Sequence, residues 1–288
     1  MTSHDHEHVA DVEWGEVVDD LVRSDDVLRP VSEQIMEWLG VTQGAKVADI
    51  GCGAGGMTAL LAGSVGPSGK VYAVDSEPAL ISATRDRCEA LGYAEWVQTL
   101  HHDLHTGVPS IARLLDLVWA SNVVHHLPDQ EAAIEQLSEL LIDSGRLALS
   151  EGGLRTVTMP WDVGVGRPGL ESRLHAAEAE WFVQMRASIP GSTRAPYGWP
   201  TLLRMAGLIN VRSRSFLLDQ PSPISAHVAG HVIGSLRNRV ERTADRLDEP
   251  DLAAWDRLLS PDSTEYIGTR DDLFCLAAIT VHVGVRRL

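Results

Sequence analysis

The sequence predicts an α/β fold in which helices cover both faces of a mostly parallel sheet. Apolar segments of strand length alternate with helical segments from residue 46 to residue 151, and strict alternation of this kind is typical of parallel sheets. A glycine-rich turn directly follows the first of these strands. The chain has 288 residues, of which 44% are hydrophobic, and this suffices for one large core with a helical elaboration.

Two helices are expected before the sheet, at residues 9–22 and 30–39. The second has apolar residues at helical spacing, among them Val31 and Ile35. Residues 4–8 contain three alternating histidines. These histidines could bind a metal, but no packed element is expected to hold them in place; no metal site is therefore predicted, and metal binding by this segment stays open.

The alternating region supplies five strands and three helices. The strands are expected at 46–50, 70–75, 95–101, 115–121 and 145–151. The helices are expected near 55–65, 78–91 and 129–142. Pro78 fits the first turn of its helix, where a backbone donor is not needed.

After Glu151 the composition changes, and the later segments suggest the domain organisation. We expect a loop at 152–169, a helix around Trp181 and a second loop at 190–200. These are followed by a helix at 200–206, a strand at 208–217, helical residues 222–260 and a strand at 273–283. We therefore expect a helical lid at 1–40, a Rossmann-like core at 41–151, a substrate-binding insertion at 152–200, and the rest of the core at 201–288 with a helical insertion at 222–260.

The composition limits the partners and the compartment. The net charge of −16, from 24 basic and 40 acidic residues, disfavours nucleic acid, because binding to phosphates depends largely on positive charge. The three cysteines lie far apart without a C-x-x-C pair, which is typical of a reducing compartment. No signal peptide and no apolar segment long enough for a bilayer is present in the sequence. A cytoplasmic protein without a membrane partner is expected.

The glycine-rich turn indicates the class of cofactor. Gly51, Gly53 and Gly56 fit the dinucleotide spacing G-x-G-x-x-G, which is a weak signal alone. Gly51, Gly53 and Gly55 behind Asp49 fit D-x-G-x-G-x-G instead. A carboxylate beside a pyrophosphate would be repelled. S-adenosylmethionine has no phosphate and carries a sulfonium and an ammonium, so Asp49 favours that cofactor over NAD.

Four further segments follow the glycine turn in order: Val71–Asp75, His102–Leu104, Asp116–Leu127 and Leu141–Leu147. Together with the turn, they resemble the class I S-adenosylmethionine-dependent methyltransferases over about residues 30–155. The resemblance implies a seven-stranded sheet whose last strand is antiparallel. In the last segment, Asp143 and Ser144 replace the proline and glycine usual in that family. The long helical segment at 222–260 is also a departure.

The resemblance also implies roles for individual residues. Asp75 would bind both ribose hydroxyls, Asp103 would lie against the adenine amino group, and the backbone near Ser121 would line the methionine part. Both acids also have a purely structural alternative: Asp75 could cap the following helix, and Asp103 could be a solvent-exposed acid in a surface loop. The expected cofactor-binding residues are Asp49, Gly51, Cys52, Gly53, Gly55, Asp75, Ser76, His102, Asp103, Leu104, Ser121 and Asn122.

The acceptor and the catalytic base are less well defined by the sequence. His126, His125 and Glu151 are candidates for a general base, since histidine titrates near neutral pH; packing and loop geometry are the alternative roles. Trp14, Trp161, Trp181 and Tyr197 are candidates for an aromatic wall that binds the acceptor, or they pack the added helices. Arg155, Arg167 and Arg194 could recognise a carboxylate or be solvated. His227 and His231 lack a visible third metal ligand.

These observations predict an enzyme that methylates a small metabolite by in-line displacement, with S-adenosylhomocysteine as the product. No nucleic-acid or membrane partner and no metal are expected, and the chain could form a homodimer. Two alternatives remain: a protein that binds S-adenosylmethionine without transferring methyl, and an NAD-dependent oxidoreductase.

Overall fold

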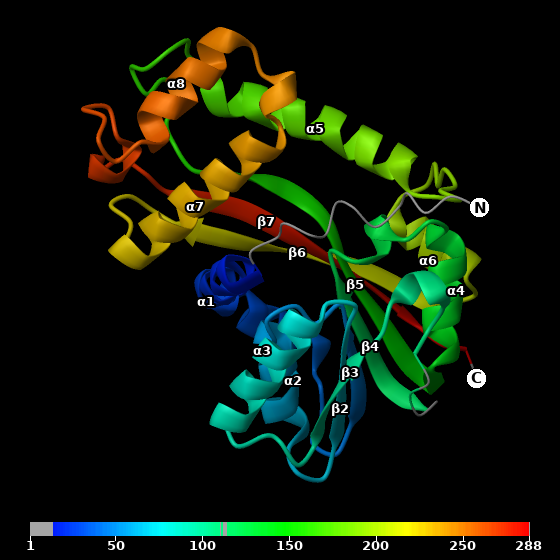
Figure 1. The fold of residues 1–288 in the computed structure, drawn as a ribbon. Helices are drawn as coiled ribbons and strands as arrows, with labels where there is room; N and C mark the ends of the chain where they lie inside the picture. The colour runs from blue at the N-terminus through cyan, green and yellow to red at the C-terminus, as the bar shows by residue number, and fades with distance from the viewer. Residues whose placement is uncertain (1–13, 110, 112–113, 288) are drawn as a thin grey trace, which may run out of the picture.

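The computed structural model describes residues 14–109, 111 and 114–287 (Figure 1). Its strands form a seven-stranded sheet in the order β3-β2-β1-β4-β5-β7-β6. The strands are β1 (Lys46–Ile50), β2 (Lys70–Asp75), β3 (Val97–His101), β4 (Leu115–Ser121), β5 (Leu141–Val157), β6 (Ile209–Gln220) and β7 (Cys275–Val285). The α-helices are α1 (Trp14–Leu39), α2 (Gly56–Val65), α3 (Pro78–Ala90), α4 (Gln130–Glu139), α5 (Leu170–Ser188), α6 (Trp199–Met205), α7 (Ala226–Arg242) and α8 (Glu249–Leu259).

The strand directions confirm the predicted fold class. Strands β1 to β5 pair in parallel, whereas β7 runs antiparallel to both β5 and β6. The sheet is therefore mostly parallel, and its last strand has the reversed direction that the resemblance implied. The reversal of strand order at β1 and β4 creates a switch point, where open α/β sheets bind ligands.

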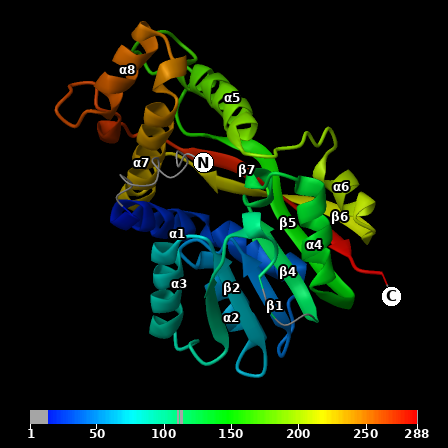
Figure 2. The same ribbon diagram turned by 45° about the vertical axis from the view of Figure 1, so that its right-hand side comes forward.

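Two apolar clusters cover the two faces of the sheet. Along β1, Val47 belongs to one cluster with α1 and α2, and its neighbours Ala48 and Ile50 belong to the other with α4 and α6. This alternation follows from the two-residue period of a strand. Helices α5, α7 and α8 form a cap at one side of the sheet, and α7 contacts α1 (Figures 1 and 2).

The N-terminal region differs from the prediction of two helices. One continuous helix, α1, runs from Trp14 to Leu39 with Pro30 inside it. The buried side chains Val27, Val31 and Ile35 lie at helical spacing on both sides of the proline. The apolar contact of this face with the core compensates for the backbone hydrogen bond that a proline removes.

Strand β5 is longer than predicted, and the expected loop at 152–169 begins later. The first part of that segment, through Val157, belongs to β5. Gly153 pairs with Ile279 of β7, and a Cβ atom on Gly153 would lie only 1.9 Å from the carbonyl oxygen of Ala278. Gly153, one of the glycines that suggested a loop, therefore permits a close approach of two strands.

Candidate functional site

A cavity of about 800 Å³ lies at the carboxyl ends of β1 to β5. Its volume falls within the range of about 300–1,000 Å³ that is typical of small-molecule sites. The cavity walls include all the predicted cofactor-binding residues except Gly55. The lining residues at the ends of the strands are Asp49, Gly51, Asp75, Ser76, His102, Asp103, Ser121, Asn122, Ser150 and Gly152.

The glycine turn leaves room for a ligand at one position. Gly51 and Gly53 adopt positive φ angles of 70° and 55°, which glycine reaches without a steric penalty. A Cβ atom on Gly51 would lie 2.1 Å from Cγ2 of Val123, whereas a Cβ on Gly53 would meet no atom within 4 Å. Because Gly53 also lines the cavity, its missing side chain opens space for a bound molecule.

Gly55 and Cys52 contribute to packing at the same turn. A Cβ on Gly55 would lie 2.9 Å from Oγ1 of Thr84 in α3, so Gly55 allows α3 to pack closely; it is not among the described residues that line the cavity. Burial raises the pKa of the Cys52 thiol well above its usual value. The thiol of Cys52 therefore stays protonated, although the residue lines the cavity.

Asp75 fixes the glycine turn from the neighbouring strand. Its Oδ2 accepts a hydrogen bond from the backbone N–H of Gly53 at 2.9 Å, and its Oδ1 accepts one from the N–H of Glu77 at 3.1 Å. The side chain that caps α3 is Glu77, which accepts a hydrogen bond from the N–H of Ala79. Each carboxylate oxygen of Asp75 keeps a second lone pair for a ligand in the cavity.

Asp49 is buried beneath the turn. Its Oδ2 accepts a hydrogen bond of 2.6 Å from Oγ1 of Thr58, and its side chain lines the cavity. Burial raises the pKa of Asp49 to about 7, although the bond from Thr58 lowers it, and the charges of Asp25 and Asp75 raise it further. A cation in the cavity would favour the ionised carboxylate and lower this pKa again.

The end of β3 presents a third carboxylate, Asp103. Its Oδ1 accepts a hydrogen bond from the backbone N–H of His105 at 2.9 Å and lies 2.8 Å from Nδ1 of the same residue. Partial burial raises the pKa of Asp103, but the hydrogen bonds from His105 prevail and the net shift is downward. Asp103 is therefore ionised at neutral pH. His102, whose Nε2 lies 2.9 Å from the carbonyl oxygen of Gly107, and Leu104 line the cavity beside it.

Of the three candidate bases, the structure places only His126 among the described residues that line the cavity. The residue lines the cavity, and its ring is partly surrounded by protein. This desolvation, reinforced by the neighbouring His125, lowers the pKa of His126 to about 4. His126 is thus neutral at physiological pH and has a ring nitrogen that can accept a proton, but its low pKa makes it a weaker base than an ordinary histidine.

Glu151 and His125 form an anchor instead. Oε1 of the buried Glu151 accepts hydrogen bonds from the backbone N–H groups of Val123 and Val124 at 3.1 and 2.9 Å. Its Oε2 lies 2.7 Å from Nδ1 of His125, whose ring packs 5.5 Å from that of Phe182. The carboxylate of Glu151 therefore holds the segment after β4 in place.

The structure does not assemble the expected aromatic wall around the cavity. Trp161 and Tyr197 are 73% and 54% exposed, and Trp181 packs beneath the guanidinium of Arg242 at 4.6 Å. None of the three is among the described lining residues, and the side chain of Trp14 lies outside the described part of the structure.

Residues that the sequence did not predict line the wall of the cavity nearest α1 and β7. In place of the four expected aromatic residues, mostly apolar or small side chains from α1, β4, β5 and β7 line it, together with one other aromatic residue, Trp119. They include Leu21, Ser24, Leu28, Ser32, Ile35, Trp119, Leu154, Thr156, Ala277 and Ile279. The α1 members recur every three or four residues, so this helical spacing could have identified them.

No group of three potential metal ligands was found among the residues described. His227 and His231 stand on α7 as a pair without a third ligand there, and residues 4–8 lie outside the described part. None of the helices that the structure describes combines the length and the apolar composition that crossing a bilayer requires.

Comparisons with known proteins agree with this geometry. A family model described as a methyltransferase domain matches residues 47–145. Nocamycin O-methyltransferase of Saccharothrix syringae is 27% identical over 80% of this chain and 81% of its own length. Aklanonic acid methyltransferase DauC of a Streptomyces species is 31% identical over 46% of this chain and 59% of its own.

A solved structure and the extent of the matches complete the comparison. Phosphoethanolamine N-methyltransferase 2 of Haemonchus contortus, in complex with S-adenosyl-L-methionine, superposes with a TM-score of 0.51 and 14% identity, over 97% of this chain and 61% of its own. This likeness supports the fold. The aligned part spans about two fifths to three fifths of the first matching curated relatives.

Proposed function

We propose that this chain, which belongs to the class I S-adenosylmethionine-dependent methyltransferases, methylates a small organic acceptor and releases S-adenosylhomocysteine. One observation carries the proposal: three carboxylates on β1, at the end of β2 and after β3, Asp49, Asp75 and Asp103, line a single cavity beside a glycine turn that is open at Gly53, and Asp25 of α1 is a fourth carboxylate in the same wall. Such a wall attracts a cationic nucleoside and repels the pyrophosphate of a dinucleotide.

Each carboxylate would bind a different part of the cofactor. Asp75 would accept hydrogen bonds from the two ribose hydroxyls, and Asp103 from the adenine amino group. Bonds to ionised acceptors of this kind contribute about 1.5–3 kcal/mol each. The buried Asp49 would stabilise the positive charge at the methionine end.

The chain's own contribution to the reaction is alignment and the exclusion of water. S-adenosylmethionine supplies a methyl group on a sulfonium, which an acceptor nucleophile displaces in line. The cavity walls formed by α1, β4 and β5 would hold the acceptor against that methyl group and keep bulk water away, which lowers the barrier without acid–base help. His126 would accept a proton from an acceptor that must lose one.

The acceptor class follows from the relatives. Two of them are named as methyltransferases of nocamycin and aklanonic acid, so a secondary metabolite is the acceptor we propose; whether an O, N or C atom receives the methyl group is left open. Cytoplasmic location, absence of a nucleic-acid partner and homodimer formation remain predictions from the sequence.

The proposal is tested by two assays on the purified chain. Calorimetric titration should show binding of S-adenosylmethionine and S-adenosylhomocysteine but not of NAD. Mass spectrometry should then detect S-adenosylhomocysteine together with a product heavier by one methylene in a panel of aromatic and polyketide acceptors. Binding of NAD instead would indicate an oxidoreductase. Cofactor binding without product from any acceptor would indicate a protein that does not transfer methyl.

A further inference from the structure

A second cavity of about 390 Å³ adjoins the first one. It lies between α1, β5, α5 and α7, and its walls share Leu21, Ser24, Arg155 and Thr156 with the first cavity. A molecule in the second cavity could therefore extend toward the site proposed for the cofactor. Its position suits the acceptor.

The walls of this second cavity are unusually basic for so acidic a protein. They contain four arginines, Arg23, Arg155, Arg239 and Arg242, but only two carboxylates, Asp20 and Glu178. Glu171, which contacts Arg239 from just outside the lining, raises the number of carboxylates to three. An excess of positive charge therefore remains in this cavity wall, although the net charge of the whole chain is −16.

The histidines of the cavity do not change this balance at neutral pH. Burial lowers the pKa of His175, and the charge of Arg239 lowers it further. Burial likewise lowers the pKa of His231, with the charge of Arg23 acting in the same direction. Both rings are therefore neutral under physiological conditions.

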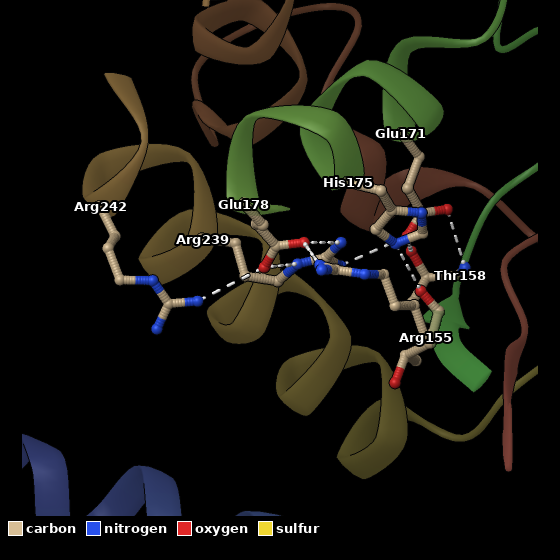
Figure 3. A network of polar contacts seen from close by, with 8 residues as sticks. Arg155, Thr158, Glu171, His175, Glu178, Arg239 and Arg242 are labelled. Atoms are coloured by element: carbon tan, nitrogen blue, oxygen red, sulfur yellow. Dashed lines mark hydrogen bonds and ion pairs between the residues drawn. The ribbon is translucent and has the colours of Figure 1, made fainter. Parts of the chain in front are cut away.

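Two of the four arginines are committed to ion pairs, Arg23 with Asp20 at 2.8 Å and Arg239 with two glutamates, and the other two have donors available. Arg239 is only 11% exposed, donates to both oxygens of Glu178 through Nε and Nη2, and reaches Glu171 at 3.4 Å. Glu171 in turn accepts hydrogen bonds of 3.0 Å from the backbone N–H and from Oγ1 of Thr158. This chain of contacts joins α5, α7 and the end of β5 (Figure 3).

Arg155 and Arg242 are held more loosely. Each makes one ion pair, with Glu178, at 3.2 and 3.3 Å, and their side chains are 50% and 44% exposed. The guanidinium of Arg242 also lies 4.6 Å from the ring centroid of Trp181, a contact with the ring face that uses none of its N–H donors. Figure 3 shows them reaching Glu178 from β5 and α7. A guanidinium has five N–H donors, so most donors of both residues are available to a ligand. Because Arg155 lies on β5 and Arg242 on α7, the two guanidinium groups could contact one bound anion from two sides.

We propose that the second cavity binds the acceptor and that Arg155 and Arg242 recognise a carboxylate on it. The planar fork of arginine matches a carboxylate with two parallel hydrogen bonds. The inference rests on the proposed methyl transfer and adds the chemical class of the acceptor: a small organic acid whose carboxylate lies in the second cavity while its nucleophile faces the first. The link between α5 and α7 does not require Arg155 or Arg242, because Arg239 already makes it.

The test measures binding of matched acids and amides in the presence of saturating S-adenosylhomocysteine. The probes are benzoate, 2-naphthoate and salicylate, each beside its neutral amide, titrated by calorimetry against the full-length protein. We expect at least one acid to bind about tenfold tighter than its amide, as one charged hydrogen bond implies. Arg155→Gln and Arg242→Gln should each remove most of that preference, because they weaken the binding of an acid more than the binding of its amide.

Arg257→Gln is the matched control. Arg257 is also 50% exposed and pairs with one carboxylate, that of Glu265, but it lies on α8 outside the described walls of both cavities. Loss of acid preference in this variant, equal binding of acids and amides, or no binding of any acid at millimolar concentration would overturn the proposal. Thermal denaturation of each variant separates loss of binding from loss of folding, and Arg155 and Arg242 provide two independent variants.

The same titrations distinguish this proposal from the proposed function. If the unmodified protein fails to bind S-adenosylhomocysteine, the methyltransferase proposal itself fails. If it binds S-adenosylhomocysteine but does not discriminate acids from amides, only the carboxylate subsite is rejected.

Discussion

The ionisation of Asp49 should make the binding of the proposed cofactor depend on pH. Burial raises the pKa of Asp49 to about 7, above the value of about 3.9 in an unfolded chain. Its contribution to folding stability is therefore fully present below about pH 4 and is lost as the pH rises through about 7. A bound cation requires the ionised form, so protons and S-adenosylmethionine compete at this carboxyl.

We predict that S-adenosylmethionine binds about tenfold more weakly at about pH 6 than at about pH 8, because only about a tenth of Asp49 is ionised at the lower pH. The Asp49→Asn variant should lose this dependence. Titration of the ligand's own ammonium is common to both proteins, so the comparison isolates Asp49. Equal pH dependence of the dissociation constants in the two proteins would remove Asp49 from cation binding.

The functional residues at the ends of strands could be predicted from the sequence, because each is identified by the few residues next to it in the chain. Asp49, Gly53 and Asp75 each follow or end a short apolar segment, and parallel strands bring such ends to one edge. The hydrogen bonds from Val123 and Val124 to Glu151 could not be predicted, because they join two distant segments through a side chain and backbone N–H groups, which leave no pattern in the sequence. The roles proposed for Glu151 and His125 as bases missed this contact.

At the scale of elements, Glu151 connects the segment after β4 to β5. Removing a buried carboxylate leaves the backbone donors of Val123 and Val124 without a partner. We predict that Glu151→Ala lowers the free energy of unfolding by about 2–4 kcal/mol, measured by denaturant titration. The control Glu33→Ala removes a carboxylate that is 55% exposed and pairs with Arg29; it should change stability by less than about 1 kcal/mol. Similar losses in both variants would show that the anchor contributes little.

The element boundaries that the sequence predicted wrongly also have physical explanations. Pro30 suggested a helix start, yet Val27 and Val31 continue one buried stripe through α1. Gly152 and Gly153 suggested a loop, yet the antiparallel approach of β7 requires a residue without a side chain in β5. In both cases long-range packing decides the outcome, and local propensity does not include it.

At the scale of the whole molecule, the core was predictable and the cap was not. The mostly parallel sheet and the position of the first cavity follow from a short series of motifs between residues 46 and 151, and the family resemblance of these motifs implied the reversed last strand. The second cavity is formed by α1, by the consecutive elements β5 and α5, and by α7, which are three separate stretches of the sequence. Arg155 and Arg242 meet there only because α5 and α7 pack beside β5 (Figure 3).

The most direct test of the central claim is the affinity of S-adenosylhomocysteine for the protein and for its Asp75→Ala variant, measured by calorimetry. Asp86→Ala, an exposed acid of α3 that is not among the described lining residues, serves as the control. We predict a rise of at least about tenfold in the dissociation constant for Asp75→Ala, unchanged binding for Asp86→Ala, and retained folding in both. Unchanged affinity in Asp75→Ala would contradict the placement of the cofactor's ribose at the end of β2.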